Sequence, residues 1–300
     1  SAVLALGQTT EPNNGRKDTH PVDYKVSTSL LSYAKRGRDQ QSRYFAHIAL
    51  AQIGGEENRK ALMELYSTGN TALEKPWAAL SLGVLAYNEY EADDSRATID
   101  TGIGAMLHTD LTKVKNPSSL AAIAVALGLV RYSEAADDLR LVMDKYKNKD
   151  DLSGYACIGL ALMDDQRSTQ QIRDLVAASV RRPDRLKQAA IALGKLGDKQ
   201  AADLLVELMT EGGTTNLAKM SALASGLGFI GDRRSVDPLI KMLQDEGLTD
   251  ISRAFAAVAL GGISEKEILP WNSKIAVDTN YRAAVETLTG SAGTGILDIL

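Results

Sequence analysis

A string of small and apolar residues recurs along this chain and constrains its fold. The string small-Leu-Gly-x-apolar-Gly-Asp is clearest at residues 192–198 and 226–232, and weaker copies lie at 5–7, 49–54, 81–85, 126–130, 159–165 and 259–263. The leucines of the later copies follow one another after 33, 33, 34 and 33 residues, at Leu127, Leu160, Leu193, Leu227 and Leu260. A fixed period of this length indicates a repeat architecture.

Each repeat holds two helical patterns. In one unit, apolar residues fall at helical spacing over 201–211, a Gly/Thr/Asn turn follows, and a second apolar pattern spans 217–230. No alternating pattern typical of a strand is long enough to be convincing. A helix pair of about 33 residues cannot bury its apolar stripe alone, but stacked pairs can. The sequence therefore predicts an all-α, right-handed α-α superhelix, an armadillo-like solenoid of about seven helix pairs.

Departures from the period suggest the domain boundaries. The intervals Leu6–Leu50 and Leu82–Leu127 are longer, and the polar stretches 9–27 and 88–101 account for the extra residues as loops. We expect residues 1–27 to be the remnant of a preceding repeat plus a polar loop, and 28–264 to be the solenoid. The period breaks after Ile263, so residues 265–300 are expected to cap the last repeat, or alternatively to insert into a neighbouring molecule. No signal peptide is visible, and we expect residues to be missing upstream, which leaves the localisation open.

The strings Ala-Leu-Gly-x-Leu-Gly-Asp, together with Asp250-x-x-Arg253-Ala254, resemble HEAT repeats of the short bacterial, PBS-lyase-like kind. The resemblance covers most of residues 28–264. It implies a binding scaffold, since most HEAT families act that way, although some are similar to phycobilin lyase subunits and a few are DNA glycosylases. The C-terminal residues Leu269–Asn272, Asn280–Glu286 and Gly295–Leu300 resemble the tail of multi-repeat HEAT proteins common in planctomycetes.

When the second helices of the repeats are aligned on their leucines, residues at the same distance from the leucine form a column of equivalent positions. The column three before the leucine is small: Ala79, Ala124, Ala190, Ala224 and Ala257, with His47 and Cys157 in the same slot. The column immediately before the leucine, which includes Ala49 and Ala126, is small as well, and small residues in both columns predict close approach of neighbouring helices. His47 is accordingly expected to be a partly buried structural residue, and Cys157 a buried thiol, rather than a ligand or a nucleophile. In HEAT repeats an arginine usually occupies the position seven residues before the leucine and pairs with an aspartate across the stack. Here this position is basic only at Arg43, Lys75 and Arg253, so a continuous Asp–Arg ladder is not expected.

Columns expected on the concave surface are unusually apolar. A helix that is apolar on all sides is normally buried, whereas an exposed apolar strip normally marks an interaction site. Two interpretations stay open: the chain covers this strip itself, or a protein or peptide partner, including a second copy, lies along it. The partner-binding candidates in these columns and the adjacent aromatic positions are Phe45, Ile48, Trp77, Leu80, Tyr155, Ile158, Phe229 and Phe255.

The charge of the chain gives little support to nucleic-acid binding. It has 34 basic and 38 acidic residues, a net charge of −4. Two basic clusters, Lys35/Arg36/Arg38/Arg43 and Arg181/Arg182/Arg185/Lys187, could bind phosphates but more readily form solvated faces at helix junctions. No apolar run is long enough for a membrane span. We expect no nucleic-acid partner.

No catalytic or metal-binding motif is found. His20, His47 and His108 stand apart, the single cysteine excludes a Cys-rich zinc site, and Asp150-Asp151 and Asp164-Asp165 fit helix caps and turns. The sequence predicts a non-enzymatic scaffold without cofactor or metal, which binds a protein partner along an apolar concave groove. The alternative is a lyase-type subunit acting on a bound tetrapyrrole, with a phosphate or nucleic-acid binder as the third hypothesis.

Overall fold

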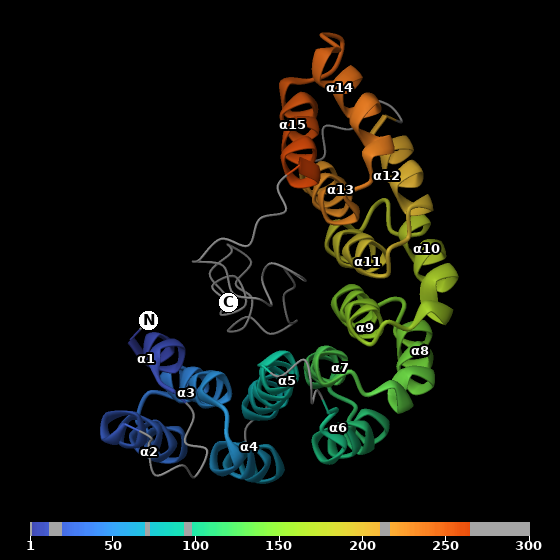
Figure 1. The fold of residues 1–300 in the computed structure, drawn as a ribbon. Helices are drawn as coiled ribbons and strands as arrows, with labels where there is room; N and C mark the ends of the chain where they lie inside the picture. The colour runs from blue at the N-terminus through green and yellow to red at the C-terminus, as the bar shows by residue number, and fades with distance from the viewer. Residues whose placement is uncertain (1, 12–19, 70–72, 93–97, 211–216, 265–300) are drawn as a thin grey trace. The chain divides into compact units, whose positions relative to one another are not determined.

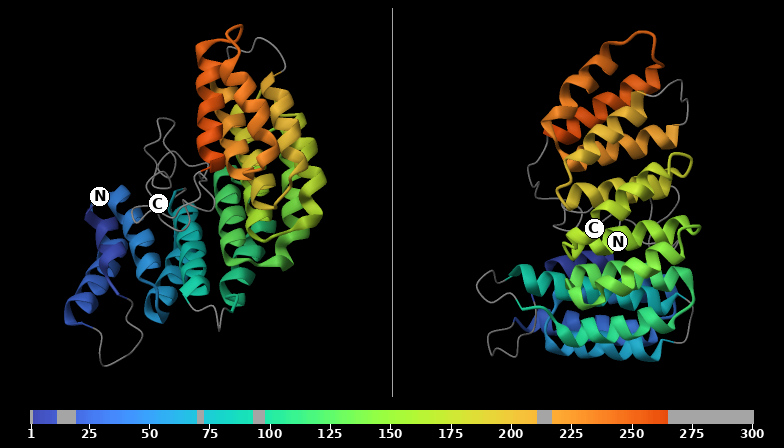
Figure 2. Two further views of the ribbon diagram at one scale, coloured as in Figure 1. Left: turned by 45° about the horizontal axis from the view of Figure 1, so that its top comes forward. Right: turned by 90° about the vertical axis from the view of Figure 1, so that its right-hand side faces the viewer.

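The computed structural model describes residues 2–11, 20–69, 73–92, 98–210 and 217–264, and every regular element in these ranges is a helix (Figure 1). Contacts divide the described chain into two compact units, which meet in sequence between Asp138 and Leu139. Each unit is a stack of antiparallel helix pairs, as the further views in Figure 2 show. None of the helices in these ranges combines the length and the apolar character that a membrane span requires.

The first unit contains one single helix and three pairs. Its helices are α1 (Ala2–Thr9), α2 (Pro21–Arg36), α3 (Gln40–Ile53), α4 (Glu56–Thr68), α5 (Glu74–Ala92), α6 (Thr101–Lys113) and α7 (Pro117–Val130). The odd-numbered helices stack on one another in one layer, and each even-numbered helix packs against the odd-numbered helix that follows it. The predicted loop 9–27 is too long, because Pro21 begins α2, with His20 as the N-cap.

The second unit repeats this arrangement with shorter connections. Its helices are α8 (Ala136–Lys145), which spans the boundary between the units, α9 (Asp150–Leu162), α10 (Thr169–Ala177), α11 (Pro183–Lys195), α12 (Gln200–Thr210), α13 (Leu217–Ile230), α14 (Val236–Gln244) and α15 (Asp250–Ser264). Here α9, α11, α13 and α15 form the stacked layer. The predicted helices 201–211 and 217–230 are confirmed as α12 and α13.

The recurring sequence string ends the second helix of a repeat. Leu127, Leu160, Leu193 and Leu227 are fully buried, and the residue four positions after each adopts a left-handed conformation, at Arg131, Asp164, Gly197 and Gly231. In three of these repeats the next backbone N–H, as at Asp198, donates to the leucine carbonyl, which closes a Schellman turn. The last position of the string before the Asp has a positive φ, which glycine adopts without strain, and this explains the glycine there. The following Asp leads into the next helix pair.

The small columns allow the stacked helices to approach closely. A β-carbon on Gly83 of α5 would lie 2.8 Å from the Cα of Ala126 in α7, and one on Gly7 of α1 would lie 2.6 Å from the Cα of Ala49 in α3. In both contacts, the glycine that follows the leucine of one repeat meets the small residue that precedes the leucine of the next repeat. The prediction of close helix contact in these columns is confirmed, and the fold is the all-α, HEAT-like solenoid of seven helix pairs within the described residues.

Candidate functional site

Five of the eight predicted partner-binding side chains lie in the hydrophobic core. They are at most 2% exposed: Ile48, Trp77, Leu80, Tyr155 and Ile158. Phe45 and Phe255 are partly exposed, and the side chain of Phe229 lies outside the described part of the chain. These five side chains are buried in the folded chain, so they offer no exposed surface to a partner.

An aromatic cluster brings two of the candidates together in the first unit. The Trp77 ring stacks on Tyr44 at a centroid distance of 5.6 Å and an interplanar angle of 16°, while Phe45 meets its edge at 5.8 Å. These contacts join α3 to α5. Offset-stacked and edge-to-face aromatic pairs stabilise packing beyond their buried area, so the role that the structure gives to Trp77 is to hold successive repeats together.

His47 is completely buried, which goes further than the partial burial expected. Neither ring nitrogen has a hydrogen-bond partner among the residues that the structure describes, and the Tyr44 ring lies edge-on at 6.1 Å. Burial, with a smaller effect from the nearby Arg43 charge, lowers the pKa of His47 to about 4. The imidazole is therefore neutral near pH 7 and fills a slot that alanine occupies in most other repeats.

Cys157 is fully buried between α9 and α8, as predicted. Its Sγ lies 3.3 Å from Met143 Sδ and 3.2 Å from the Ser153 carbonyl oxygen. Burial raises the pKa of the thiol to about 12. Since the thiolate is the nucleophilic form, this environment makes Cys157 an inert core residue.

The other two histidines have local structural contacts. His20 accepts a hydrogen bond from the Val22 N–H at the start of α2. His108 Nε2 lies 2.7 Å from an Asp138 carboxylate oxygen, and its ring meets Tyr132 edge-on. In the ranges that the structure describes, no group of three or more His, Cys, Asp or Glu residues is arranged to hold a metal ion.

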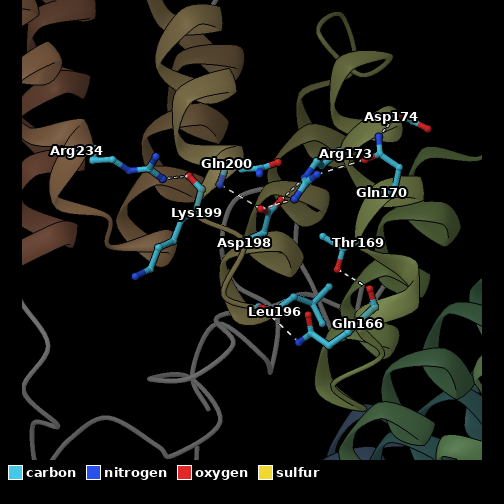
Figure 3. A network of polar contacts seen from close by, with 10 residues as sticks. All are labelled: Gln166, Thr169, Gln170, Arg173, Asp174, Leu196, Asp198, Lys199, Gln200 and Arg234. Carbon is cyan, nitrogen blue, oxygen red and sulfur yellow. Dashed lines mark hydrogen bonds and ion pairs between the residues drawn. The ribbon is translucent and has the colours of Figure 1, made fainter.

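Ion pairs connect adjacent repeats in the second unit at positions that the sequence analysis missed. Arg173 of α10 donates from Nε and Nη2 to the Asp198 carboxylate, at 2.5 and 2.7 Å (Figure 3). One repeat earlier, Arg140 of α8 pairs with Asp165. Arg140 and Arg173 are 33 residues apart, as are Asp165 and Asp198, so the repeat period carried the signal for this second ladder.

The ladder changes in the next repeat. The position 33 residues after Arg173 is Val206, and Asp232 pairs instead with Arg234 of its own turn, at 2.8 Å. Arg234 also donates to the Lys199 carbonyl oxygen at 2.6 Å, which restores a link to the preceding repeat (Figure 3). The family-type arginine column contributes separately in the first unit, where Arg43 pairs with Glu74 and Lys75 with Asp110.

The acidic pairs identified in the sequence have structural roles. Asp165 belongs to the ladder, and Asp164 adopts the left-handed conformation that ends α9. Asp150 pairs with Arg182 at 2.7 Å, while burial, with the nearby Asp184 and Asp150 charges, raises the pKa of Asp151. Asp164 thus has the turn role expected of its pair, whereas Asp150 and Asp151 lie in the first turn of α9, whose N-cap is Lys149 without a side-chain cap hydrogen bond.

The basic clusters differ in how far they are neutralised. Arg185 is buried and donates to the Ser179 hydroxyl and to the carbonyl oxygens of Ala178 and Lys147. In the other cluster Lys35 pairs with Glu64 at 2.7 Å. Arg36 and Arg38 make no hydrogen bond or ion pair within the described residues, and both line a hollow of about 540 Å³ at the end of α2.

The last described helix exposes residues whose counterparts are buried. Val258 of α15 is 58% exposed, whereas Ile191, at the same repeat position in α11, is 2% exposed. The exposed residues on this side of α15 follow helical spacing: Ala254, Ala257, Val258 and Gly261. We refer to these four residues as the α15 face. Among the described helices none follows α15, and the predicted cap, residues 265–300, lies outside the described ranges.

Comparison with known proteins supports the repeat assignment. A family model described as the PBS lyase HEAT-like repeat matches residues 186–211 and 221–245. The first match spans most of α11 and all of α12, and the second most of α13 and all of α14. No curated protein matches the sequence. The matched repeats, the stacked helix pairs and the regular spacing of the leucines agree, and the chain is a HEAT-repeat protein in which residues 186–211 and 221–245 match repeats of the PBS lyase HEAT-like kind.

Proposed function

We propose that this HEAT-repeat protein is a non-enzymatic scaffold that binds a protein or peptide partner. The observation that carries the proposal is the α15 face, which is exposed although it has the residue types that receive a neighbouring helix elsewhere in the stack. Such a stripe, with small residues beside Val258, fits the apolar side of a partner helix. Phe255, one of the predicted partner-binding residues, lies one turn from Val258 and adds a partly exposed ring.

The environments of the most reactive side chains favour a role without chemistry. His47 is neutral and enclosed, and the Cys157 thiol is held protonated in the core. Both sit in a column that is otherwise filled mainly by alanine. Residues that would have to reach a substrate are thus used for packing, and this supports a scaffold rather than an enzyme.

Substitution of Val258 by Asp tests the proposal. A carboxylate on the α15 face should abolish retention of the partner in affinity purification of the full chain from its native source. Leu141→Asp is the matched control, because Leu141 is 67% exposed on α8 and lies outside the face. Thermal unfolding of both variants should match the wild type, since both positions are exposed.

Two results would overturn the proposal. One is the absence of any retained protein together with a monomeric sedimentation profile for the wild type. The other is a marked loss of stability in Val258→Asp alone, which would mean that the chain covers the α15 face with its own residues. Loss of the partner in Val258→Asp but not in Leu141→Asp, at unchanged stability, supports it.

A lyase-type subunit acting on a bound tetrapyrrole is the second candidate. The observation in its favour is the description of the matched repeats as PBS lyase HEAT-like. Visible absorption of the natively purified protein distinguishes the two, because a bound tetrapyrrole gives a coloured species and the scaffold does not.

A further inference from the structure

The hollow beside the end of α2 has a set of side chains that the proposed partner binding does not use. It lies in the first unit, where the last two turns of α2 meet the segment that leads into α3. Its volume is about 540 Å³. The polar side chains that line it and enter the argument are Thr28, Ser29, Ser32, Tyr33, Arg36 and Arg38.

Most of these polar groups have no hydrogen-bond or ion-pair partner in the described part of the chain. Arg36, Arg38, Ser29, Ser32 and the Tyr33 hydroxyl make no hydrogen bond or ion pair among the residues that the structure describes. Thr28 differs, because its hydroxyl donates to the carbonyl oxygens of Tyr24 and Lys25. The hollow thus collects two guanidinium groups and three hydroxyls, all of which can donate hydrogen bonds.

Nearby negative charge is too small to neutralise the two arginines. Asp39 follows Arg38, but its carboxylate accepts the Ser42 N–H at 2.7 Å as the N-cap of α3. The C-terminal end of α2 contributes a partial negative charge of roughly half an elementary charge, and one of its carbonyls, that of Tyr33, already accepts the Gly37 N–H at 2.7 Å. Two full positive charges outweigh the Asp39 carboxylate and the helix end together, so these described groups give the hollow an excess of positive charge.

We propose that this hollow binds the phosphate group of a small phosphate monoester. A guanidinium group matches the oxygens of a phosphate and can donate two parallel hydrogen bonds to them. The hydroxyls supply further donors, and the Tyr33 ring, 37% exposed, offers an apolar surface to the organic part of the ligand. The hollow is open to solvent, so the ligand would lie in it partly exposed rather than enclosed.

The proposal is tested by titrating the full chain with phenyl phosphate and following the protein by NMR. Phenol and inorganic phosphate, each of which represents one part of phenyl phosphate, are titrated separately as controls. We expect phenyl phosphate to bind more tightly than inorganic phosphate, and phenol to cause no saturable change. Raising the salt concentration should weaken binding of phenyl phosphate, because the attraction depends on exposed charges.

Variants decide whether the hollow is the site. The double variant Arg36→Gln/Arg38→Gln should weaken binding of phenyl phosphate by about tenfold or more, corresponding to the loss of two charge-assisted contacts. Arg181→Gln is the matched control, because Arg181 is an exposed arginine that makes no hydrogen bond or ion pair within the described residues. Equal binding by the double variant, equal weakening by Arg181→Gln, or binding of phenol as tight as that of phenyl phosphate would overturn the proposal. All of these outcomes are independent of partner binding at the α15 face.

Discussion

Arg173 and Asp198 form a two-point contact across one repeat boundary, with Nε and Nη2 of the arginine 2.5 and 2.7 Å from the two carboxylate oxygens. The Asp198 side chain is only 4% exposed, and its Oδ1 also accepts the Gln200 N–H at 3.1 Å. The carboxylate therefore fixes both the preceding helix α10 and the turn into α12. Removing the arginine would leave a buried charge with one backbone donor.

Arg173→Gln is accordingly expected to lower the free energy of unfolding by about 2 kcal/mol, since an unpaired buried charge is costly. Lys35→Gln is the comparison, because Lys35 and Glu64 form an exposed pair and such pairs contribute at most about 1 kcal/mol. Urea denaturation of both variants measures the difference. Equal effects of the two substitutions would show that the Arg173–Asp198 contact is not a structural link between repeats.

The ladder illustrates what a single sequence can and cannot reveal. The leucine period is visible because Leu127, Leu160, Leu193 and Leu227 are all fully buried, and it predicted the helix pairs correctly. Arg140–Asp165 and Arg173–Asp198 obey the same period, but each pair joins two columns that are 25 residues apart. The contact could be recognised only once the packing of successive repeats was known.

The apolar columns show a different limit. Ile191 and Val258 are similar residues at one repeat position, yet one is buried and the other is 58% exposed. The residue type does not reveal whether another helix covers it. For the same reason the sequence suggested a binding strip at Trp77 and Tyr155, whose side chains pack in the core.

Gly83 and Gly261 both follow the repeat leucine and should respond oppositely to substitution by alanine. In Gly83→Ala the new β-carbon would lie 2.8 Å from the Cα of Ala126, so α5 and α7 must move apart. We expect a loss of stability of about 1–3 kcal/mol. In Gly261→Ala no atom of the described residues lies within 4 Å of the new β-carbon, and the higher helix propensity of alanine should stabilise α15 by up to about 1 kcal/mol.

Thermal and urea unfolding of the two glycine variants check this expectation. Because the two positions are equivalent in the repeat, helix propensity alone predicts the same sign for both. Stabilisation of Gly83→Ala would therefore contradict the close approach of α5 and α7.

His47 predicts a loss of stability in acid. Its pKa is about 4 in the folded protein and about 6.5 when the chain is unfolded, so the unfolded state binds the proton more tightly. Stability should be complete above pH 6.5 and should fall as the pH decreases from 6.5 to 4, by up to about 3 kcal/mol from this residue. The positive charge of Arg43 also opposes protonation of His47, so it lowers the pKa of this residue as burial does.

The His47→Ala variant isolates this contribution. Carboxylates in ion pairs also lose stability in acid, so the measured quantity is the difference in free energy of unfolding between wild type and variant at pH 7, 6, 5 and 4. That difference should shift in favour of the variant as the pH falls. A constant difference over the range would mean that His47 is accessible to protons in the folded protein.

Cys157 should be unreactive while the protein is folded, because two effects act together. The side chain has no exposed surface, and a pKa of about 12 leaves almost no thiolate at pH 8. We expect a thiol reagent such as Ellman's reagent to label the folded chain only at the rate of unfolding, and to label one thiol at once in denaturant. A Leu141→Cys/Cys157→Ala variant provides an exposed thiol for comparison and should react immediately without denaturant. Rapid labelling of the folded wild type would mean that α8 and α9 separate around Met143 and Cys157.

Loss of the sulfur in Cys157→Ala should lower the free energy of unfolding by only about 1 kcal/mol, since alanine is the usual residue of this column.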